Sequence, residues 1–564
     1  MISLISVRIL LGLALITAYE SPPSKQAEQT LRIYADLKHT GLLTGPLTSS
    51  SLAPNDFGIA VPIPARTADR DRWPEKLDVG DPMVERLGRL RIETTQAKGD
   101  IGVAIESESR SCLRLFRNAD GGWRRLAPSE DSIWTLAPGS DGTLELGVGV
   151  VMPEVRPSEA QVPWPRTFTV EISAKSEAIP MMRVPFRLAP FVIPSTLEPV
   201  DELLIVSQTV TADSVRAVRA FAARTGLKLV THEVDEMCDQ WMQDTIEPGL
   251  FAFPTAEGSE QARACLSGLR KLSRPSSAKL DNKVARWLRR QGVVTLAPGI
   301  PRKQPRWNDW YGNIEATPPH TDRQGQSFPY GRVITGKQRA FTMHPGVMKF
   351  LEAQGVQWPP IFVDTSWLAI GHVDEVVNFV PAKSKAGFKV LLPSPKAARS
   401  MLQVLIDKGL AEALVFKATP DERTLDTLRT TFAQTSENFA IDEAVARVRE
   451  QLKMELNLED SDIVMVPALF DGGLAVIPNA VNSVVVNGYL LVAEPLGPQL
   501  NERDGFEQAI RASLAGCDVQ VVFIDAWKAY HVAGGEVHCG TNTFRRLRDP
   551  AWWTHVGKAD EKAE

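Results

Sequence analysis

The chain has 564 residues, of which 43% are hydrophobic and 23% are charged, and its formal net charge is -5. These values are typical of a globular protein, and the length exceeds what one small core covers, so we expect two or three domains. The slight negative charge gives no sign of the basic field of a nucleic-acid binder, so we expect no nucleic-acid partner. The five cysteines form no CxxC pair and no zinc-binding spacing, which argues against a disulfide or zinc scaffold.

The amino-terminal segment, residues 1–29, has the pattern of a secretory signal peptide followed by a linker. Arg8 precedes the apolar run 9–16 (ILLGLALI), and the small residue Ala18 stands where a cleavage site is expected. The run is too short for a comfortable membrane span and no later run is longer, so we expect no span in the mature chain. Export would place the protein outside the cell or in the periplasm. The alternative is a buried first strand or helix in a cytoplasmic protein.

The remaining chain divides into two regions of different texture. Over residues 30–195, short apolar or alternating segments such as LRIYAD, IGVAIES and TFTVEIS are separated by turn residues, a pattern that predicts a β-sandwich. Over residues 196–564, strands such as ELLIVSQT interleave with helices, which predicts an α/β or α+β region. These helices include SVRAVRAFAARTG, ending at Gly226, and a long polar helix over 424–456. We find no clear internal repeat, no Walker A loop and no GxGxxG motif.

Three segments of the second region combine residue types that carry chemistry. They are CDQWMQDTIEPGL (238–250), DTSWLAIGHVDEVVNFVP (364–381) and HVAGGEVHCGTNTFRR (531–546). The first contains Asp244, and the third places Cys539 close to glycines. The second places His372 and Asp374 two residues apart, which in an extended segment would direct both side chains to one face.

These residue types suit the binding and hydrolysis of a guanidinium group. Guanidinium is planar and stays protonated, so a site that binds it needs carboxylates aimed at its edges. A thiolate could attack the central carbon, and a histidine could carry protons. Taken singly, each residue is more often structural, because a lone histidine or a cysteine after a glycine turn usually just packs.

The combination of motifs resembles the protein-arginine deiminases. WMQDTIE, SWLAIGHVDEVVNFVP and GEVHCGTN are similar to three motifs of that family. Two further stretches agree, namely GNIEATPP (312–319) with YGRVITG (330–336), and IPNAVNSVVVNG (477–488). The resemblance implies an α+β multidomain protein. It implies an immunoglobulin-like β-sandwich over 30–195 and a pentein domain, a pseudo-fivefold α/β propeller, over 196–564. We expect the animal enzymes' additional amino-terminal domain to be missing.

The resemblance also implies a role for each motif residue. Cys539 would attack the guanidinium carbon as a thiolate, while Asp244 and Asp374 would bind the guanidinium nitrogens. His372 would protonate the departing ammonia and then activate the water that cleaves a thiouronium intermediate. Trp241 would flank the aliphatic stem of the bound arginine, although it could equally be a core aromatic residue.

The resemblance further implies one calcium site near this centre. Its ligands would be the side chains of Gln243, Glu247 and Glu315 and the backbone carbonyls of Tyr311 and Ile314. An all-oxygen set of this kind suits Ca²⁺. Because the glutamine adjoins the first catalytic aspartate, metal binding could draw that carboxylate into place.

Other features of the animal enzymes lack a clean counterpart. A second calcium site would need a carboxylate where this chain has Thr245, and the middle-domain calcium loops keep only Asp36 of their acidic pattern, so we expect weaker calcium dependence. The arginine that contacts the substrate backbone is matched poorly by our two candidates, Arg270 and Arg274.

The sequence therefore predicts calcium-assisted hydrolysis of protein- or peptide-bound arginine to citrulline, with release of ammonia. One alternative is a deiminase that acts on free arginine, its derivatives or peptide-terminal arginine. A second alternative is a non-catalytic module that binds arginine-rich partners.

Overall fold

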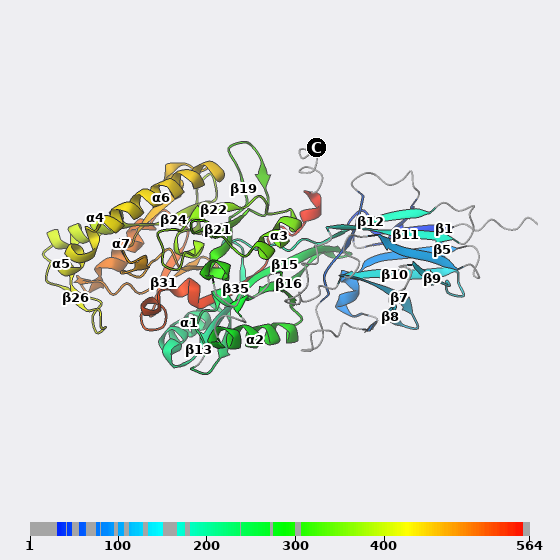
Figure 1. Ribbon diagram of the computed structural model, residues 1–564, viewed down its shortest axis with the longest axis horizontal. Coiled ribbons are helices and arrows are strands. Elements are labelled where there is room, and N and C mark those ends of the chain that lie inside the picture. Colours follow the sequence, from blue (N-terminus) through cyan, green and yellow to red (C-terminus); the bar gives the residue numbers. More distant parts are fainter. Residues whose placement is uncertain are drawn as a thin grey trace, which may run out of the picture.

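The computed structural model describes residues 31–555 except 41, 48–55, 64–74, 79, 95–99, 107–111, 128–132, 151–165, 175–180, 237, 271–274 and 299–305. The expected signal segment 1–29 and Arg274 lie outside these residues. A β-rich lobe occupies one end of the long axis, and a larger lobe of mixed helices and strands occupies the other (Figure 1). Across the described ranges, no helix is both long and apolar enough to cross a membrane.

The β-rich lobe consists of two sheets. The larger has the order β2 (Thr44–Leu47), β1 (Leu31–Ala35), β5 (Gly88–Thr94), β10 (Thr143–Val150), β7 (Leu113–Ala119), β8 (Gly122–Arg125) and β4 (Lys76–Asp78). The smaller has the order β3 (Gly58–Ala60), β12 (Met182–Leu188), β11 (Thr167–Ala174), β6 (Ile101–Glu106) and β9 (Ile133–Leu136). Alternate residues of β5 and β6, among them Ile92 and Val103, are fully buried in one shared core. The period-2 pattern of the sequence therefore directs one face of each sheet inward.

The second lobe contains several small mixed sheets instead of one large sheet. Within the described residues, five three-stranded sheets share one pattern, in which a first strand pairs antiparallel with a middle strand and a third strand runs parallel to the middle one. At least one helix connects the middle strand to the third. We call each such set a ββαβ unit.

The units are as follows. The first combines β35 (Thr541–Arg545), β13 (Val200–Ser207), α1 (Ala212–Thr225) and β14 (Lys228–Glu233); the second β15 (Ile246–Thr255), β16 (Gly258–Ser267), α2 (Pro275–Arg290) and β17 (Val294–Leu296); the third β18 (Ile314–Ala316), β21 (Val333–Lys337), α3 (Pro345–Gln354) and β22 (Ile361–Asp364); the fourth β23 (Asn378–Pro381), β24 (Phe388–Ser394), α4 (Pro395–Asp407), α5 (Leu425–Leu428), α6 (Ser436–Glu455) and β27 (Ile463–Pro467); the fifth β30 (Val484–Val486), β31 (Tyr489–Ala493), α7 (Gly505–Ser513) and β34 (Gln520–Ile524). The first unit joins strands from distant parts of the chain, because β35 pairs with β13.

The helices follow local signals with one exception. Helix α1 ends at Gly226, whose left-handed φ of 71° is favourable for glycine, as the sequence predicts. The single long helix expected over 424–456 is wrong. It is divided into α5, a π-helical turn (Arg429–Ala433) and α6, because the Thr435 side chain caps α6 by accepting a hydrogen bond from the Asn438 N–H.

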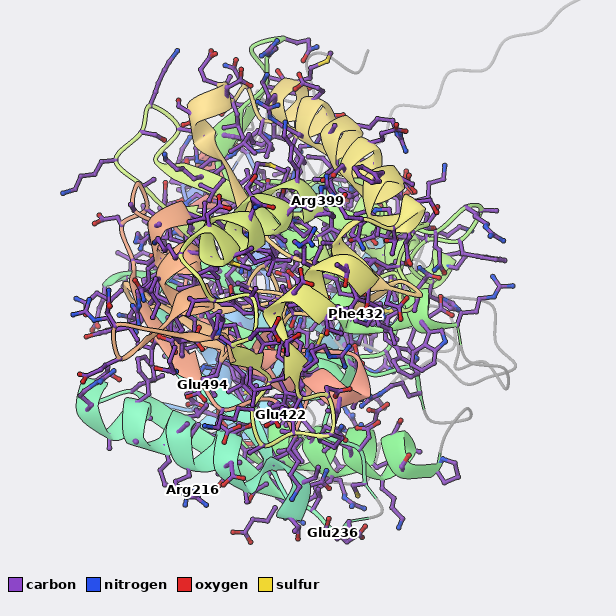
Figure 2. The ribbon with its side chains drawn as sticks, turned by 90° about the vertical axis from the view of Figure 1, so that its left-hand side faces the viewer. Arg216, Glu236, Arg399, Glu422, Phe432 and Glu494 are labelled. Carbon is purple, nitrogen blue, oxygen red and sulfur yellow. The ribbon has the colours of Figure 1, made fainter. Side chains whose placement is uncertain are left out.

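Helices α4 and α6 cover the end of the molecule that is remote from the β-rich lobe. Arg399 of α4 is labelled in Figure 2, which looks onto this end. Its guanidinium pairs with Asp442 of α6 and lies 4.4 Å from the ring centre of Phe439. An ion pair combined with a cation–π contact therefore joins the two helices.

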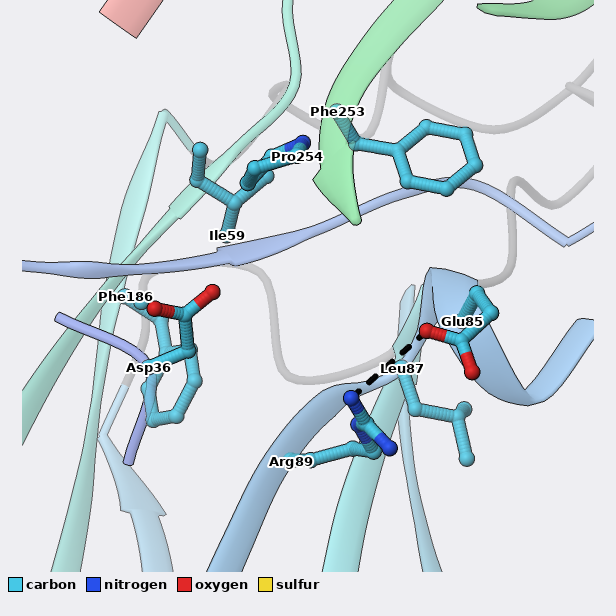
Figure 3. Close-up of a pocket in the computed structure, with 9 residues that line it drawn as sticks. Asp36, Ile59, Glu85, Leu87, Arg89, Phe186, Phe253 and Pro254 are labelled. Carbon is cyan, nitrogen blue, oxygen red and sulfur yellow. Dashed lines mark ion pairs between the residues drawn. The ribbon is translucent and has the colours of Figure 1, made fainter. Parts of the chain in front are cut away.

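The two lobes share a continuous hydrophobic core, to which β15 contributes Phe251 and Phe253. Where the end of β15 meets the β-rich lobe, Phe253 and Pro254 line a small cavity opposite Asp36 and Arg89 (Figure 3). Buried glutamine side chains also cross the junction. The Gln357 amide, for example, accepts from the Ile193 N–H and donates to the Ile193 carbonyl, at 2.9 Å each. The lobes are thus packed as one body.

Candidate active site

A residue two to four positions before the first strand of each ββαβ unit contributes to one place. Asp244 precedes β15, Gly312 precedes β18, Asp374 precedes β23, Asn482 precedes β30 and Cys539 precedes β35. Hydrogen bonds and close contacts connect them in two linked groups, described below. The four predicted catalytic residues are therefore all buried in one region, although the chain separates them widely.

The Cys539 thiol lies in the short helix α8 (Val537–Gly540) and is held from two sides. Its Sγ is 3.4 Å from Asp374 Oδ2 and 3.1 Å from the Asn482 Nδ2, which donates to the sulfur. The Cys539 N–H donates to Asn482 Oδ1 at 3.2 Å, so one asparagine side chain fixes both ends of the cysteine. The sequence reasoning missed Asn482, although it belongs to the IPNAVNSVVVNG stretch.

His372 faces the other carboxylate. Its Nδ1 is 3.7 Å from Asp244 Oδ1, and its Nε2 is 2.8 Å from the Trp307 carbonyl oxygen. The Gly312 N–H donates to Asp244 Oδ1 at 3.3 Å, and a Cβ at this glycine would lie 2.5 Å from His372 Nδ1. Glycine at position 312 thus permits the approach of histidine and aspartate.

The segment 372–374 (HVD) is not extended, contrary to the assumption behind the spacing argument. His372 has extended dihedral angles, but Val373–Glu375 form a turn of 3-10 helix, and the Glu375 carboxylate accepts from the His372 N–H at 3.0 Å. His372 therefore contacts Asp244, whereas Asp374 contacts the thiol. The segment serves both groups because it turns between them.

The centre is electrostatically poised to receive a cation. Burial raises the pKa of Asp244, an effect that His372 and Arg270 partly offset. Burial also raises the pKa of Cys539 well above its ordinary value, and Asp374, Asp244 and Glu375 raise it further. Asp374 Oδ1 is buried and has no hydrogen-bond partner among the described residues. A positive group that met these carboxylates would relieve the repulsion and supply the missing donor.

His538, which the sequence reasoning also missed, adjoins the nucleophile in the GEVHCGTN motif. Its Nδ1 is 2.9 Å from Asp374 Oδ2 and its Nε2 is 3.2 Å from Glu315 Oε1. Burial alone would lower the pKa of His538, but the two carboxylates raise it to about 10. The imidazole is therefore a cation at neutral pH. It connects Asp374, which contacts the thiol, to Glu315, one of the predicted calcium ligands.

Four of the five predicted calcium ligands contact one another or line the same cavity. The Gln243 amide lies 3.3 Å from both Glu247 Oε2 and the Tyr311 carbonyl. Gln243, Glu247 and Glu315 line one cavity together with His538 and Arg545. Burial raises the pKa of Glu247 well above its usual range, and the Glu315 charge raises it further. Ile314, the fifth ligand, is the buried residue before Glu315 in β18.

The donor chemistry fits a calcium ion. The buried Glu247 carboxylate and the partly buried Glu315 carboxylate repel each other, and with an amide and a carbonyl beside them they form the oxygen set that Ca²⁺ prefers. Glu315 Oε1 makes an ion pair with His538 but no hydrogen bond within the described part of the chain. No group of three or more His, Cys, Asp or Glu suited to a metal occurs in that part, and the predicted set contains only two such residues.

The predicted substrate-binding residues have different positions. Trp241 is partly exposed and lies against Gly535, where an added Cβ would be 2.8 Å from its ring. Arg270 is 0% exposed and its guanidinium is bound by Asp281, Asp239 and Thr245. Its expected contact with a substrate backbone is therefore wrong, because the side chain does not reach a surface.

Comparison with known proteins agrees with this arrangement. The family profile described as protein-arginine deiminase (PAD) matches residues 179–554. The chain belongs to the protein-arginine deiminase family. The match includes all five segments that converge on the thiol.

Two human members of the deiminase family illustrate the degree of similarity. Protein-arginine deiminase type-4 of Homo sapiens is 32% identical over 394 residues, which cover 66% of this chain and 56% of that protein. The human type-1 protein is 31% identical over 393 residues, which cover 66% of this chain and 57% of that protein. The chain thus spans just over half the length of these relatives.

Solved structures that align with the chain include two agmatine deiminases. The enzyme from C. jejuni aligns with a TM-score of 0.36 and 11% identity, covering 64% of this chain and 97% of that one. The enzyme from Enterococcus faecalis aligns with a TM-score of 0.37 and 13% identity, covering 64% and 97%.

Proposed function

We propose that the protein hydrolyses arginine side chains of proteins or peptides to citrulline and ammonia, with Cys539 as nucleophile. The observation that carries this proposal is the thiol held 3.4 Å from Asp374 in a buried centre that also contains Asp244 and His372. A planar cation that filled this centre would be gripped by two carboxylates and presented to the sulfur.

The reaction has two covalent stages. The Cys539 thiolate attacks the guanidinium carbon, the bond from that carbon to one terminal nitrogen breaks, and His372 gives the departing nitrogen the proton that makes it ammonia. The resulting thiouronium is then attacked by water, whose proton returns to His372. The carbon–sulfur bond breaks and the remaining hydroxyl releases its proton to solvent, which leaves the ureido group of citrulline and restores the thiolate.

The substrate itself promotes ionisation of the thiol. Burial and the nearby carboxylates raise the pKa of Cys539 well above its ordinary value, so the thiol is protonated before an arginine binds. A guanidinium cation bound by Asp244 and Asp374 cancels those negative charges and lowers the thiol pKa again. The nucleophile therefore forms chiefly when a cationic substrate is in place, which limits reaction with neutral electrophiles.

We further propose that Gln243, Glu247 and Glu315, with the carbonyls of Tyr311 and Ile314, hold one Ca²⁺ ion. Bound calcium would supply positive charge between the two glutamates, next to the turn that carries the first catalytic aspartate. Addition of Ca²⁺ should raise the melting temperature of the wild type and leave a Glu247→Gln variant unchanged. An equal shift in both proteins, or none in either, would show that this ligand set is wrong.

The preceding division into domains forms part of the proposal. We propose that residues 30–195 are an immunoglobulin-like domain and that 196–564 form a pseudo-fivefold pentein propeller, a reading that the five ββαβ units support. We also retain residues 1–29 as an export signal with a linker. Amino-terminal sequencing of the protein recovered from a periplasmic or culture fraction would test that assignment.

One observation favours the alternative function, in which the protein acts on free arginine, its derivatives or peptide-terminal arginine. Arg270, one of the two candidates for holding a substrate backbone, is buried. We therefore compare ammonia release from free arginine, a blocked arginine ester and an unfolded protein, each measured with chelator and with calcium. Faster turnover of free arginine than of the unfolded protein would show that the alternative function, deimination of free arginine, is correct and that protein deimination is not.

The Cys539→Ala variant separates catalysis from simple binding. It should fold normally and form no citrulline, because no other group in the centre can supply the sulfur nucleophile. Citrulline formation by this variant would refute the mechanism. A wild-type protein that binds arginine peptides but releases no ammonia would indicate the non-catalytic module.

A further inference from the structure

Arg270 is the largest fully buried side chain of the described residues, and it follows strand β16. Its Nη2 donates to Asp281 Oδ1 and to Thr245 Oγ1, each at 2.6 Å, and its Nη1 donates to Asp239 Oδ2 at 3.1 Å. Two carboxylates and a hydroxyl thus bind one guanidinium. A buried arginine with this many partners is an internal cation.

The same side chain supports the turn that carries Asp244. Thr245 Oγ1, which accepts from Arg270, donates its own proton to the Trp241 carbonyl at 2.8 Å. The Thr245 hydroxyl therefore joins the two ends of the segment 241–245, and the Arg270 guanidinium holds that hydroxyl in position. Asp244 lies inside that segment, between the two residues that are tied together.

Arg270 also supports the second holder of Asp244. Its guanidinium carbon lies 5.5 Å from the ring centre of Trp310. That tryptophan comes two residues before Gly312, whose N–H donates to Asp244 Oδ1. One cation therefore contacts both segments that determine where this carboxylate lies, although it does not reach the reacting centre.

We propose that Arg270 is a positioning residue that sets the place of Asp244 through Thr245 and Trp310 without touching the substrate. This inference rests on the proposed function, because Asp244 is there the group that binds the guanidinium. The residue provides a fixed charge in the protein itself, so its contribution does not depend on any bound metal ion.

The test compares Arg270→Met, Arg270→Lys and Thr245→Val with the control Arg332→Met. Arg332 is also buried, pairs with Glu455 at 2.6 Å and lies 5.0 Å from the ring centre of Phe328. Its replacement should therefore disturb the fold about as much as replacement of Arg270 does. Steady-state kinetics on a blocked arginine ester are measured below the melting temperature of each variant.

We expect Arg270→Met to raise KM by about 10- to 150-fold, the range for losing a hydrogen bond to a charged group. Lysine keeps the charge but not the planar fork, so Arg270→Lys should recover part of the loss. Thr245→Val breaks the connection while the cation stays, and we expect KM to rise about tenfold. Arg332→Met should lower stability and leave KM unchanged.

A second readout distinguishes positioning from folding. Cys539 is labelled with a haloacetamidine, whose amidinium needs the carboxylates, and with iodoacetamide, which does not. Arg270→Met should slow the first reaction relative to the second, whereas a purely structural role would leave their ratio unchanged. If Arg270→Met does not fold, an unchanged KM and labelling ratio in both Thr245→Val and Arg270→Lys would overturn the proposal.

Failure of the proposed function gives a different result. A wild-type protein that makes no citrulline from any arginine substrate would refute the function itself. A wild type that turns over normally beside an Arg270→Met variant with the same KM would refute only the positioning role.

Discussion

A single methyl group at position 312 should disable the centre. An added Cβ would lie 2.5 Å from His372 Nδ1 and 3.1 Å from Asp244 Oδ1, whereas ordinary van der Waals contact begins near 3.4 Å. The imidazole must therefore retreat by about 0.9 Å (3.4 − 2.5) in Gly312→Ala. A displacement of about 1 Å in a catalytic group can cost about 100-fold in rate, so we expect kcat to fall by about that factor.

The assay is citrulline formation from a blocked arginine ester, with the melting temperature measured in parallel. Overpacking alone costs about 1–3 kcal/mol of stability, so a matched control is needed. Gly58→Ala provides one, because its Cβ would meet the Phe186 ring of the β-rich lobe in the same way. We expect both variants to lose stability and only Gly312→Ala to lose kcat.

The result that would refute this reasoning is specific. A folded Gly312→Ala protein that keeps kcat within about threefold of the wild type would show that His372 tolerates displacement from Asp244. Its assignment as the proton carrier would then be wrong. A comparable loss of kcat in Gly58→Ala would instead show that the effect is global.

Three further predictions concern other contacts. Asn482→Ala removes the amide that holds both the sulfur and the backbone N–H of Cys539, and kcat/KM should fall about 10- to 150-fold, as for a lost hydrogen bond to a charged group. Asp374→Asn removes a carboxylate that raises the pKa of Cys539, so iodoacetamide labelling should begin at lower pH than in the wild type; an unchanged profile would contradict the electrostatic account. Gln357→Leu leaves the Ile193 N–H and carbonyl at the lobe junction without their partner, which should cost about 2–4 kcal/mol in urea unfolding while kcat measured in buffer stays normal.

Local patterns in the sequence predict local features well. Alternating residues such as those of β5 predict which side of a strand is buried, and Gly226 predicts the end of α1, because both depend on neighbours in the chain. The motif residues Asp244, His372 and Cys539 are likewise identifiable, since each occurs in a short distinctive segment.

Local sequence patterns do not predict the features that depend on tertiary contacts. The five ββαβ units share strand pairing and not recognisable sequence, so no repeat is evident in the chain itself. The break before α6 depends on a single threonine cap, Thr435, within a segment that otherwise favours helix. Arg270 looks like a surface residue in the sequence, and only the positions of Asp239 and Asp281 explain its burial.

The pairing of β35 with β13 affects when the proposed active site becomes complete. Strand β13 is synthesised first among the strands of the second lobe, yet its antiparallel partner is synthesised last, together with the cysteine that precedes it. A growing polypeptide thus contains Asp244 and Asp374 before it contains Cys539. Under the proposed function, reactivity toward arginine should appear only once β35 has paired with β13 and brought Cys539 to the two aspartates.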